Sequence, residues 1–189
     1  MSDAAATISP EAVTAEHFDV LIVGAGISGI DAAYHIQTHY PDRSIVLLET
    51  QDSFGGTWHT HKYPGIRSDS DLFTFGYKWK PWTGAPIATA GEIMNYLNEV
   101  LDEQDIRRHI RYRHQVMNAS WSSDEKLWTL EVISKDTGES RFFTCNFLWM
   151  CQGYYRHDEG YTPEWPGMED YQGQIVHPQT WPEDLDYKG

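Results

Sequence analysis

The sequence predicts an α/β fold with a mainly parallel sheet and a small antiparallel β excursion. Two short apolar runs, at residues 18–23 and 45–48, flank a segment that can form a helix. A glycine-rich turn joins the first run to that segment. Alternating apolar residues later in the chain predict antiparallel strands, followed by another apolar run at 147–151.

The first half is expected to begin with a strand, a helix and a second strand. Continuously apolar runs such as 18–23 and 45–48 are typical of buried parallel strands. Residues 28–39 carry apolar side chains compatible with a helix, which the tripeptide YPD at 40–42 ends. Together they predict a right-handed βαβ unit.

Residues 51–89 show no clear periodicity and are rich in glycine, proline and tryptophan. Irregular segments of this length are usually functional or disordered, and the many aromatic residues argue against disorder. Residues 91–102 form the clearest helix, with an apolar stripe at helical spacing.

The region that follows is expected to be β structure. Alternation at 110–116 and 128–132 predicts two strands, and residues 142–145 are a third candidate after a turn at 136–138. The run 147–151 is predicted to be a further buried parallel strand.

Composition excludes several classes of protein. With 28 acidic and 14 basic residues, the 189-residue chain has a formal net charge of −14, which argues against nucleic-acid binding. No run approaches the ~18 apolar residues of a spanning helix. The two cysteines, Cys145 and Cys151, and the lack of an export signal predict a reducing, cytoplasmic location. His59 and His61 lack a third ligand nearby, so no metal site is expected.

Residues 24–29, with the sequence GAGISG, match G-x-G-x-x-G between a strand and a helix. In a Rossmann-like fold Gly24 allows the tight turn, Gly26 lets a pyrophosphate approach, and Gly29 lets helix and strand pack closely. The N-terminus of the helix presents free N–H groups to phosphates, and Ser28 can add a hydroxyl contact.

Glu49 ends the second strand, 20 residues beyond Gly29, where a carboxylate can accept hydrogen bonds from ribose hydroxyls. Because like charges repel a 2′-phosphate, this site suits FAD or NAD rather than NADP. The alternative is that the glycines serve only a tight turn. The sequence GGTW at 55–58 has two interpretations. The glycine pair can let the chain pass close to a flat ligand that Trp58 flanks. Alternatively, the segment is an ordinary surface turn with a core tryptophan.

Two longer motifs are more specific. GGTW at 55–58, YPG at 63–65 and Asp69 fit A/G-G-x-W-x4-F/Y-P-G/M-x3-D. The segment 171–182 fits F-x-G-x3-H-x3-W-P, with Tyr171 replacing phenylalanine. With these motifs the chain resembles the Baeyer–Villiger monooxygenases from about residue 19 to 187, and most closely their ethionamide-activating, medium-sized ketone branch.

This resemblance implies FAD in the first dinucleotide fold and NADPH in a second one. In that family the reduced flavin reacts with O2, and the flavin peroxide converts a ketone to an ester or lactone. Some relatives oxygenate a sulfide instead. The implied partners are therefore a small ketone or sulfide and O2, without nucleic acid or metal.

The resemblance also assigns roles to matching positions. The ADP half of FAD would be held by Gly24, Gly26, Ser28, Gly29 and Glu49. The flavin side would be lined by Gly56, Thr57, Trp58 and His59, and the adenine would meet the backbone of Val116.

The remaining family positions concern the nicotinamide. Arg67, Ser68 and Asp69 would face the contact between flavin and nicotinamide, with Asp69 in a catalytic role, orienting the family's arginine. His177 and Trp181 would couple NADPH binding to domain movement.

We therefore expect a disordered tail at 1–16, an FAD-binding domain at 17–153 and a connector at 154–189 toward an NADPH-binding domain outside the chain. No second G-x-G-x-x-G is found, so the chain alone is expected to be inactive and a C-terminal part could complement it. Alternatives are a non-catalytic FAD-binding fragment and an N-hydroxylating or sulfur-oxidising flavin monooxygenase. A flavin disulfide reductase is disfavoured because residues 51–89 contain no cysteine.

Overall fold

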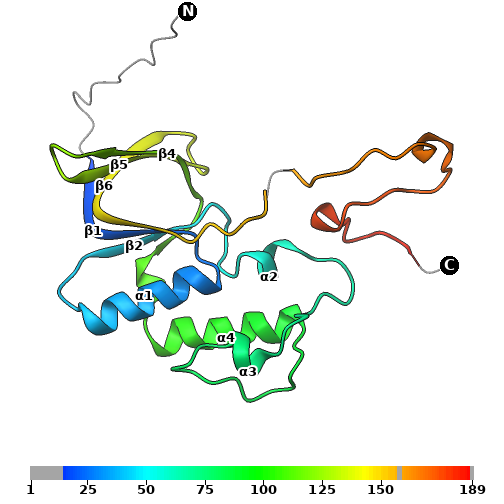
Figure 1. Ribbon diagram of the computed structural model, residues 1–189, viewed down its shortest axis with the longest axis horizontal. Coiled ribbons are helices and arrows are strands. Elements are labelled where there is room, and N and C mark those ends of the chain that lie inside the picture. Colours follow the sequence, from blue (N-terminus) through cyan, green and yellow to red (C-terminus); the bar gives the residue numbers. More distant parts are fainter. Residues whose placement is uncertain (1–14, 157–158, 188–189) are drawn as a thin grey trace, which may run out of the picture.

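The computed structural model describes residues 15–156 and 159–187. Most of the predicted tail, residues 1–14, lies outside the described residues, and the first strand already begins at its last position, Glu16. A six-stranded sheet has the strand order β3-β2-β1-β6-β5-β4. In Figure 1 the two longer helices, α1 and α4, lie on the same side of this sheet.

The bounds follow the chain. The strands are β1 (Glu16–Val23), β2 (Ile45–Leu48), β3 (Ile110–Arg111), β4 (His114–Ser122), β5 (Leu127–Ser134) and β6 (Ser140–Met150). The α-helices are α1 (Ile27–His39), α2 (Thr57–Thr60), α3 (Leu72–Phe75) and α4 (Ala90–Glu103). Single 3-10 turns are formed by Arg107–His109, Met168–Asp170 and Pro178–Thr180.

The predicted βαβ unit is confirmed. β1 pairs in parallel with β2, Val20 lying opposite Ile45, and β2 pairs in parallel with β3. The core between these strands and the helices contains Ile22, Ile30 and Leu97, all fully buried. Burying such side chains contributes about 1.5–3 kcal/mol each, so this core fixes the strand ends that carry the site.

The region predicted as a single strand at 110–116 is two strands. β3 extends the parallel part beside β2, whereas β4 pairs antiparallel with β5. Between them Arg113 has a left-handed φ of 58°, and its N–H donates to the backbone oxygen of Gln51. Alternation of apolar residues continues through this turn, so the pattern could not reveal it.

The strands predicted at 142–145 and 147–151 are instead one long strand, β6. Its first part pairs antiparallel with β5, and it also pairs in parallel with β1. The predicted burial of the second part is wrong: Phe147 is 55% exposed and Trp149 is 38% exposed. These two side chains line a shallow groove with Ile36 of α1, and no helix among the described residues covers it.

The irregular segment 51–89 is ordered, as its aromatic content predicts. It contains α2 and α3 and packs on α1, where the Tyr77 hydroxyl donates to the Ile27 oxygen over 2.7 Å. It leads into α4 through a capping box formed by Thr89 and Glu92.

The connector at 154–187 runs away from the sheet (Figure 1). It contacts the rest of the chain where the rings of His61 and Tyr155 lie 5.3 Å apart and where Lys62 Nζ lies 2.6 Å from Glu183 Oε1. Within the part of the chain that the structure describes, no helix is long and apolar enough to cross a membrane.

Candidate functional site

The glycine-rich turn has the backbone that its sequence predicts. Gly24 has a φ of +101°, and a Cβ there would lie 2.6 Å from the Cys151 oxygen. A Cβ on Gly29 would lie 1.9 Å from the Gly24 oxygen. Packing within the protein therefore requires glycine at both of these positions.

Gly26 differs, because nothing in the protein requires a glycine there. Its φ of −77° and ψ of −173° are open to any residue. A Cβ would make only an ordinary contact, 3.7 Å from the Gly56 Cα. The absence of a side chain at this position leaves space beside the turn, which we call the cradle. In the G-x-G-x-x-G motif, a pyrophosphate binds in this space.

The N-terminus of α1 meets this space. Gly26 is the N-cap residue, and among the described residues no side chain caps the helix. The first N–H groups of a helix lack partners within it, and its dipole places partial positive charge there. The first turn has no acidic residue and Ser28 is exposed, so the 13-residue helix can bind an anion.

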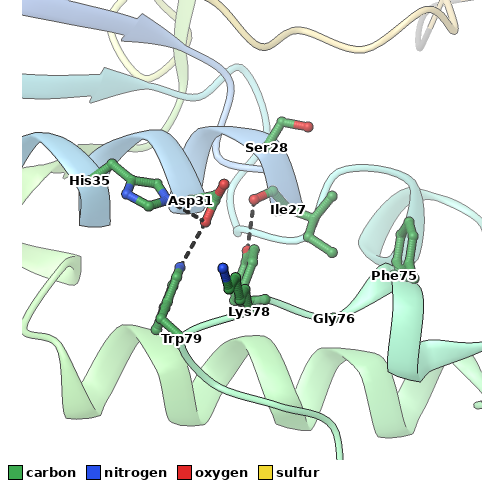
Figure 2. Close-up of a pocket in the computed structure, with 9 residues that line it drawn as sticks. Ile27, Ser28, Asp31, His35, Phe75, Gly76, Lys78 and Trp79 are labelled. Atoms are coloured by element: carbon green, nitrogen blue, oxygen red, sulfur yellow. Dashed lines mark hydrogen bonds and ion pairs between the residues drawn. The ribbon is translucent and has the colours of Figure 1, made fainter.

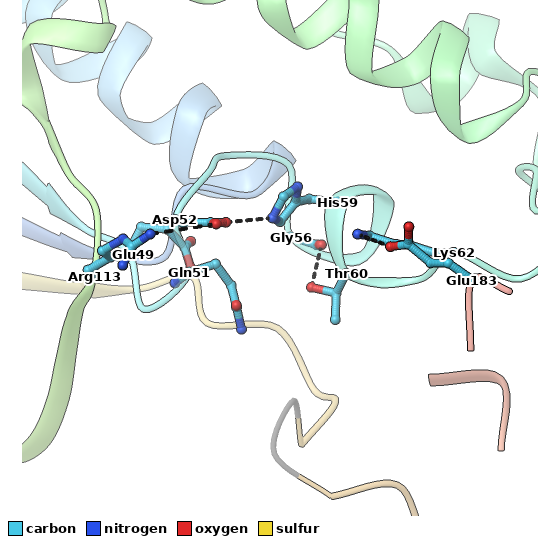
Figure 3. Close-up of polar contacts among 9 residues, drawn as sticks. All are labelled: Glu49, Gln51, Asp52, Gly56, His59, Thr60, Lys62, Arg113 and Glu183. Atoms are coloured by element: carbon cyan, nitrogen blue, oxygen red, sulfur yellow. Dashed lines mark hydrogen bonds and ion pairs between the residues drawn. The ribbon is translucent and has the colours of Figure 1, made fainter. Parts of the chain in front are cut away.

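Glu49, predicted as the ribose ligand, follows β2 and is only 7% exposed. Its Oε2 accepts from the Ala25 N–H over 2.7 Å, and its Oε1 accepts from the Gln51 N–H over 2.8 Å. A carboxylate offers about four lone-pair positions, so each oxygen keeps capacity for a hydroxyl. Figure 3 shows Glu49 at the strand end, beside Gln51.

The GGTW segment lies directly against the glycine-rich turn. The Gly55 N–H donates to the Ala25 oxygen over 3.0 Å, and Gly56 is the N-cap of α2, which begins at Thr57. Trp58 packs on the core and meets the Phe75 ring edge-on at 6.2 Å, so much of its indole serves packing.

His59 points toward Asp52, with 3.1 Å between Nε2 and Oδ1 (Figure 3). The His59 hydrogen bond lowers the pKa of Asp52. Asp52 lies in the loop before α2 and His59 lies in α2, close to Gly56, so the pair adds polar groups to the predicted flavin side.

The three consecutive residues predicted at the nicotinamide contact differ in the direction of their side chains. Ser68 is 4% exposed, and its hydroxyl donates to the Ser70 oxygen over 2.7 Å. Arg67 and Asp69 are exposed. The Ser68 N–H donates to the Ala88 oxygen, which ties the segment to the start of α4. The serine therefore holds the turn that presents its two charged neighbours.

Val116 lies on β4, close to the carboxyl end of the parallel strands. The Glu49 N–H donates to the Arg111 oxygen, and the His114 N–H donates to the Glu49 oxygen over 2.8 Å. The ladder shifts register between Val116 and Asn118. Val116, which is predicted to contact the adenine, thus lies two positions after His114, whose N–H donates to the Glu49 oxygen.

His177 and Trp181 make their described contacts within the connector. His177 Nδ1 accepts from the Gln179 N–H over 3.1 Å, so Nε2 carries the proton and donates to the Tyr161 oxygen. The Trp181 ring lies 5.6 Å from that of Tyr187. The structure does not bring these two side chains to the glycine-rich turn.

Sequence reasoning missed a cavity of about 580 Å³ between α1 and residues 75–79. Figure 2 shows Asp31, His35 and Trp79 lining it, with Trp79 Nε1 donating to Asp31 Oδ1 over 2.8 Å. Neither Glu49 nor the glycines at 24, 26 and 29 line this cavity. Its only signal in the sequence is the aromatic run FGYKW at 75–79, which does not reveal its partner helix.

Metal ligands do not gather in the described ranges: no group of three histidine, cysteine, aspartate or glutamate residues there could hold an ion. Burial raises the pKa of the Cys145 thiol to about 11, which keeps it protonated and unreactive near neutral pH.

Comparisons with known proteins identify relatives of this chain. Residues 22–99 match the model of a NAD(P)-binding Rossmann-like domain. The chain is 55% identical to the FAD-containing monooxygenase EthA of Mycolicibacterium smegmatis, over 92% of this chain and 35% of that protein. The chain is a homologue of the FAD-containing monooxygenases. It spans about a third of the length of the curated relatives it matches.

Solved structures of Baeyer–Villiger monooxygenases have the same fold as this chain. An open crystal structure of cyclohexanone monooxygenase has a TM-score of 0.74 and 28% identity, covering 90% of this chain and 33% of that one. The OTEMO complex with FAD and NADP has a TM-score of 0.70 and 28% identity, covering 87% of this chain and 31% of that one. The predicted resemblance is thereby confirmed as homology to FAD-containing monooxygenases and as a fold shared with Baeyer–Villiger monooxygenases.

Proposed function

We propose that this chain forms the FAD-binding part of an FAD- and NADPH-dependent monooxygenase that uses O2 to convert a ketone to an ester or lactone. A sulfide is the second substrate class of such an enzyme. One observation carries the proposal: the uncapped N-terminus of α1 opens on the space beside Gly26, next to the buried carboxylate of Glu49.

In this proposal the chain's own groups bind and orient. The first N–H groups of α1 bind the diphosphate, and the remaining lone pairs of Glu49 accept from the ribose hydroxyls. Bound FAD supplies the redox chemistry. The carboxylate of Glu49 repels a 2′-phosphate, so NADPH is assigned to a second site supplied by the rest of a full-length protein.

The flavin side is assigned to residues 56–59, with Arg67 and Asp69 presented beside it. Asp69 is exposed and carries a negative charge that can orient an arginine from another part of the enzyme. His177 and Trp181 belong to the connector, where movement of a neighbouring domain would reach them. Complete turnover is therefore assigned to this chain together with the remainder of the protein.

The proposal is tested by titrating the purified chain with FAD and recording the flavin absorption band. Gly26→Ala fills the cradle without straining the backbone, so FAD affinity should fall by about tenfold or more while the melting temperature is unchanged. Gly91→Ala is the matched control, because nothing lies within 4 Å of a Cβ there, and it should bind FAD normally. Equal FAD affinity in both variants contradicts the site.

The reaction itself is tested by adding FAD, NADPH and a cyclic ketone in air-saturated buffer to the chain, alone and mixed with the remaining two-thirds of a relative such as EthA. Lactone should form only in the mixture. Lactone formation by the chain alone contradicts the assignment of NADPH to a second site.

A further inference from the structure

The backbone of Ala25, in the centre of the glycine-rich turn, is held on both sides of its Cα. Its N–H donates to Glu49 Oε2 over 2.7 Å, and its oxygen accepts from the Gly55 N–H over 3.0 Å. The backbone of one residue, through the two peptide groups that flank its Cα, therefore connects the carboxylate after β2 with the glycine pair that precedes α2. The two glycine segments also touch directly, since a Cβ on Gly56 would lie 3.3 Å from the Gly26 Cα.

We propose that Glu49 is a positioning residue that locks the diphosphate turn to the flavin-side segment before any cofactor binds. Its carboxylate fixes the N–H of Ala25, and the oxygen of the same residue in turn fixes Gly55 and the start of α2. This role is additional to ribose binding. Its importance for FAD rests on the proposed function, whereas the lock itself belongs to the ligand-free chain.

The chemistry of the lock requires a carboxylate. Glu49 receives two N–H donors, one on each oxygen, from Ala25 and Gln51. A glutamine offers one acceptor oxygen and one NH2 donor, so one of the two backbone N–H groups would face another donor. Because the side chain is 7% exposed, water cannot readily replace the lost acceptor.

The neighbouring backbone transmits the constraint. Gly55 has a φ of +110°, and a Cβ there would lie 2.3 Å from Met94 Sδ of α4. The Gly55 Cα thus lies close to a side chain of α4, while the Gly55 N–H donates to the Ala25 oxygen. A preformed turn raises the fraction of molecules that can bind FAD, which increases the association rate and the apparent affinity.

The test measures amide hydrogen exchange by NMR in the ligand-free chain. In the wild type, the Ala25, Gln51 and Gly55 amides should be protected without FAD. Glu49→Gln should accelerate exchange at Ala25 and Gly55 by about tenfold or more, with Leu97 in α4 unchanged. Glu125→Gln, in an exposed turn, is the matched control and should change none of them.

Acceleration at Ala25 without acceleration at Gly55 overturns the relay, and unprotected amides in the wild type overturn the whole lock. If Glu49→Gln does not fold, Glu49→Asp keeps the charge but cannot reach both donors, and it should show the same accelerated exchange.

Stopped-flow binding of FAD separates this inference from the proposed function. The lock predicts that Glu49→Gln slows FAD association, while loss of a ribose contact alone speeds dissociation. Weaker FAD binding with unchanged exchange in the ligand-free chain contradicts the lock and leaves the FAD site standing. Failure of the wild type to bind FAD, with accelerated exchange in Glu49→Gln, contradicts the proposed function and supports the lock.

Discussion

Residues 16–153 and the connector at 154–187 are held by different forces. In the first region, paired strands and two helices bury a continuous core, and Leu47, Ile93 and Leu97 have no exposed surface. In residues 154–156 and 159–187, which the structure describes, the connector forms two 3-10 turns and no strand or α-helix. Its aromatic side chains are exposed, Tyr154 by 88% and Tyr161 by 85%.

This difference separates two groups among the predicted site residues. Gly24, Gly26 and Glu49 are fixed by strand ends and backbone hydrogen bonds, so their geometry is complete within this chain. His177 and Trp181 are held by contacts within an extended segment, and their proposed role depends on a surface outside it. The first region can therefore be tested alone, and the second cannot.

The largest effect is expected from a substitution in the glycine-rich turn of residues 16–153. In Gly29→Ala the new Cβ meets the Gly24 oxygen, so α1 must move away from β1. We expect a loss of about 3 kcal/mol or more in the free energy of unfolding, measured by urea denaturation. Gly91→Ala, in the open face of α4, should be neutral or slightly stabilising. Equal midpoints for the two variants would show that the turn is not tightly packed.

A smaller effect is expected at the opposite end of β1. The Ser44 N–H, the Ser44 hydroxyl and Arg43 donate to Asp19, and they lower its pKa from 3.8 to about 2. Since the folded state holds the charged form, this stabilisation is complete well above pH 3.8 and is lost as the pH falls toward 2.

Asp19→Asn should therefore be less stable than the wild type at pH 7, by at most about 2 kcal/mol because the site is partly screened by solvent. The difference, measured by urea denaturation at several pH values, should shrink below about pH 4. A gap that stays constant down to pH 3 would show that the charge of Asp19 does not contribute.

The smallest effect is expected from removing the connector, which tests whether it adds to the stability of residues 16–153. Removal of residues 154–189 deletes the contacts of Tyr155 and Glu183 with the rest of the chain, both at exposed positions. Exposed ion pairs contribute little, so the free energy of unfolding should fall by less than about 1 kcal/mol. A much larger loss would show that the connector is part of the folded core.

Local patterns predicted the parts of the site that depend on local geometry. A strand, a glycine-rich turn and a helix follow one another within residues 16–39, and the acidic residue that completes them ends the next strand. Such a unit is specified by apolar runs and by glycines that packing requires, so its sequence is sufficient to locate Gly26 and Glu49.

The parts that pattern could not predict depend on long-range contacts. The turn at Arg113 is fixed by Gln51, 62 positions earlier, and the alternation of apolar residues passes through it unchanged. Likewise, Phe147 and Trp149 look like core residues in sequence, and their exposure depends on which helices cover β6. The inward orientation of Ser68 follows from its hydrogen bond to Ser70, which residue type alone does not reveal.

In the proposed site, the N-terminus of α1 binds the diphosphate of FAD beside Glu49. This binding is tested most directly by recording ¹H–¹⁵N spectra of the chain while adding ADP and then FAD. We predict that both ligands shift the amide signals of Gly26, Ile27 and Ser28 most strongly. Unchanged amide signals at saturating FAD, or changes confined to residues 75–79, which line the cavity beside α1, would contradict FAD binding at this turn.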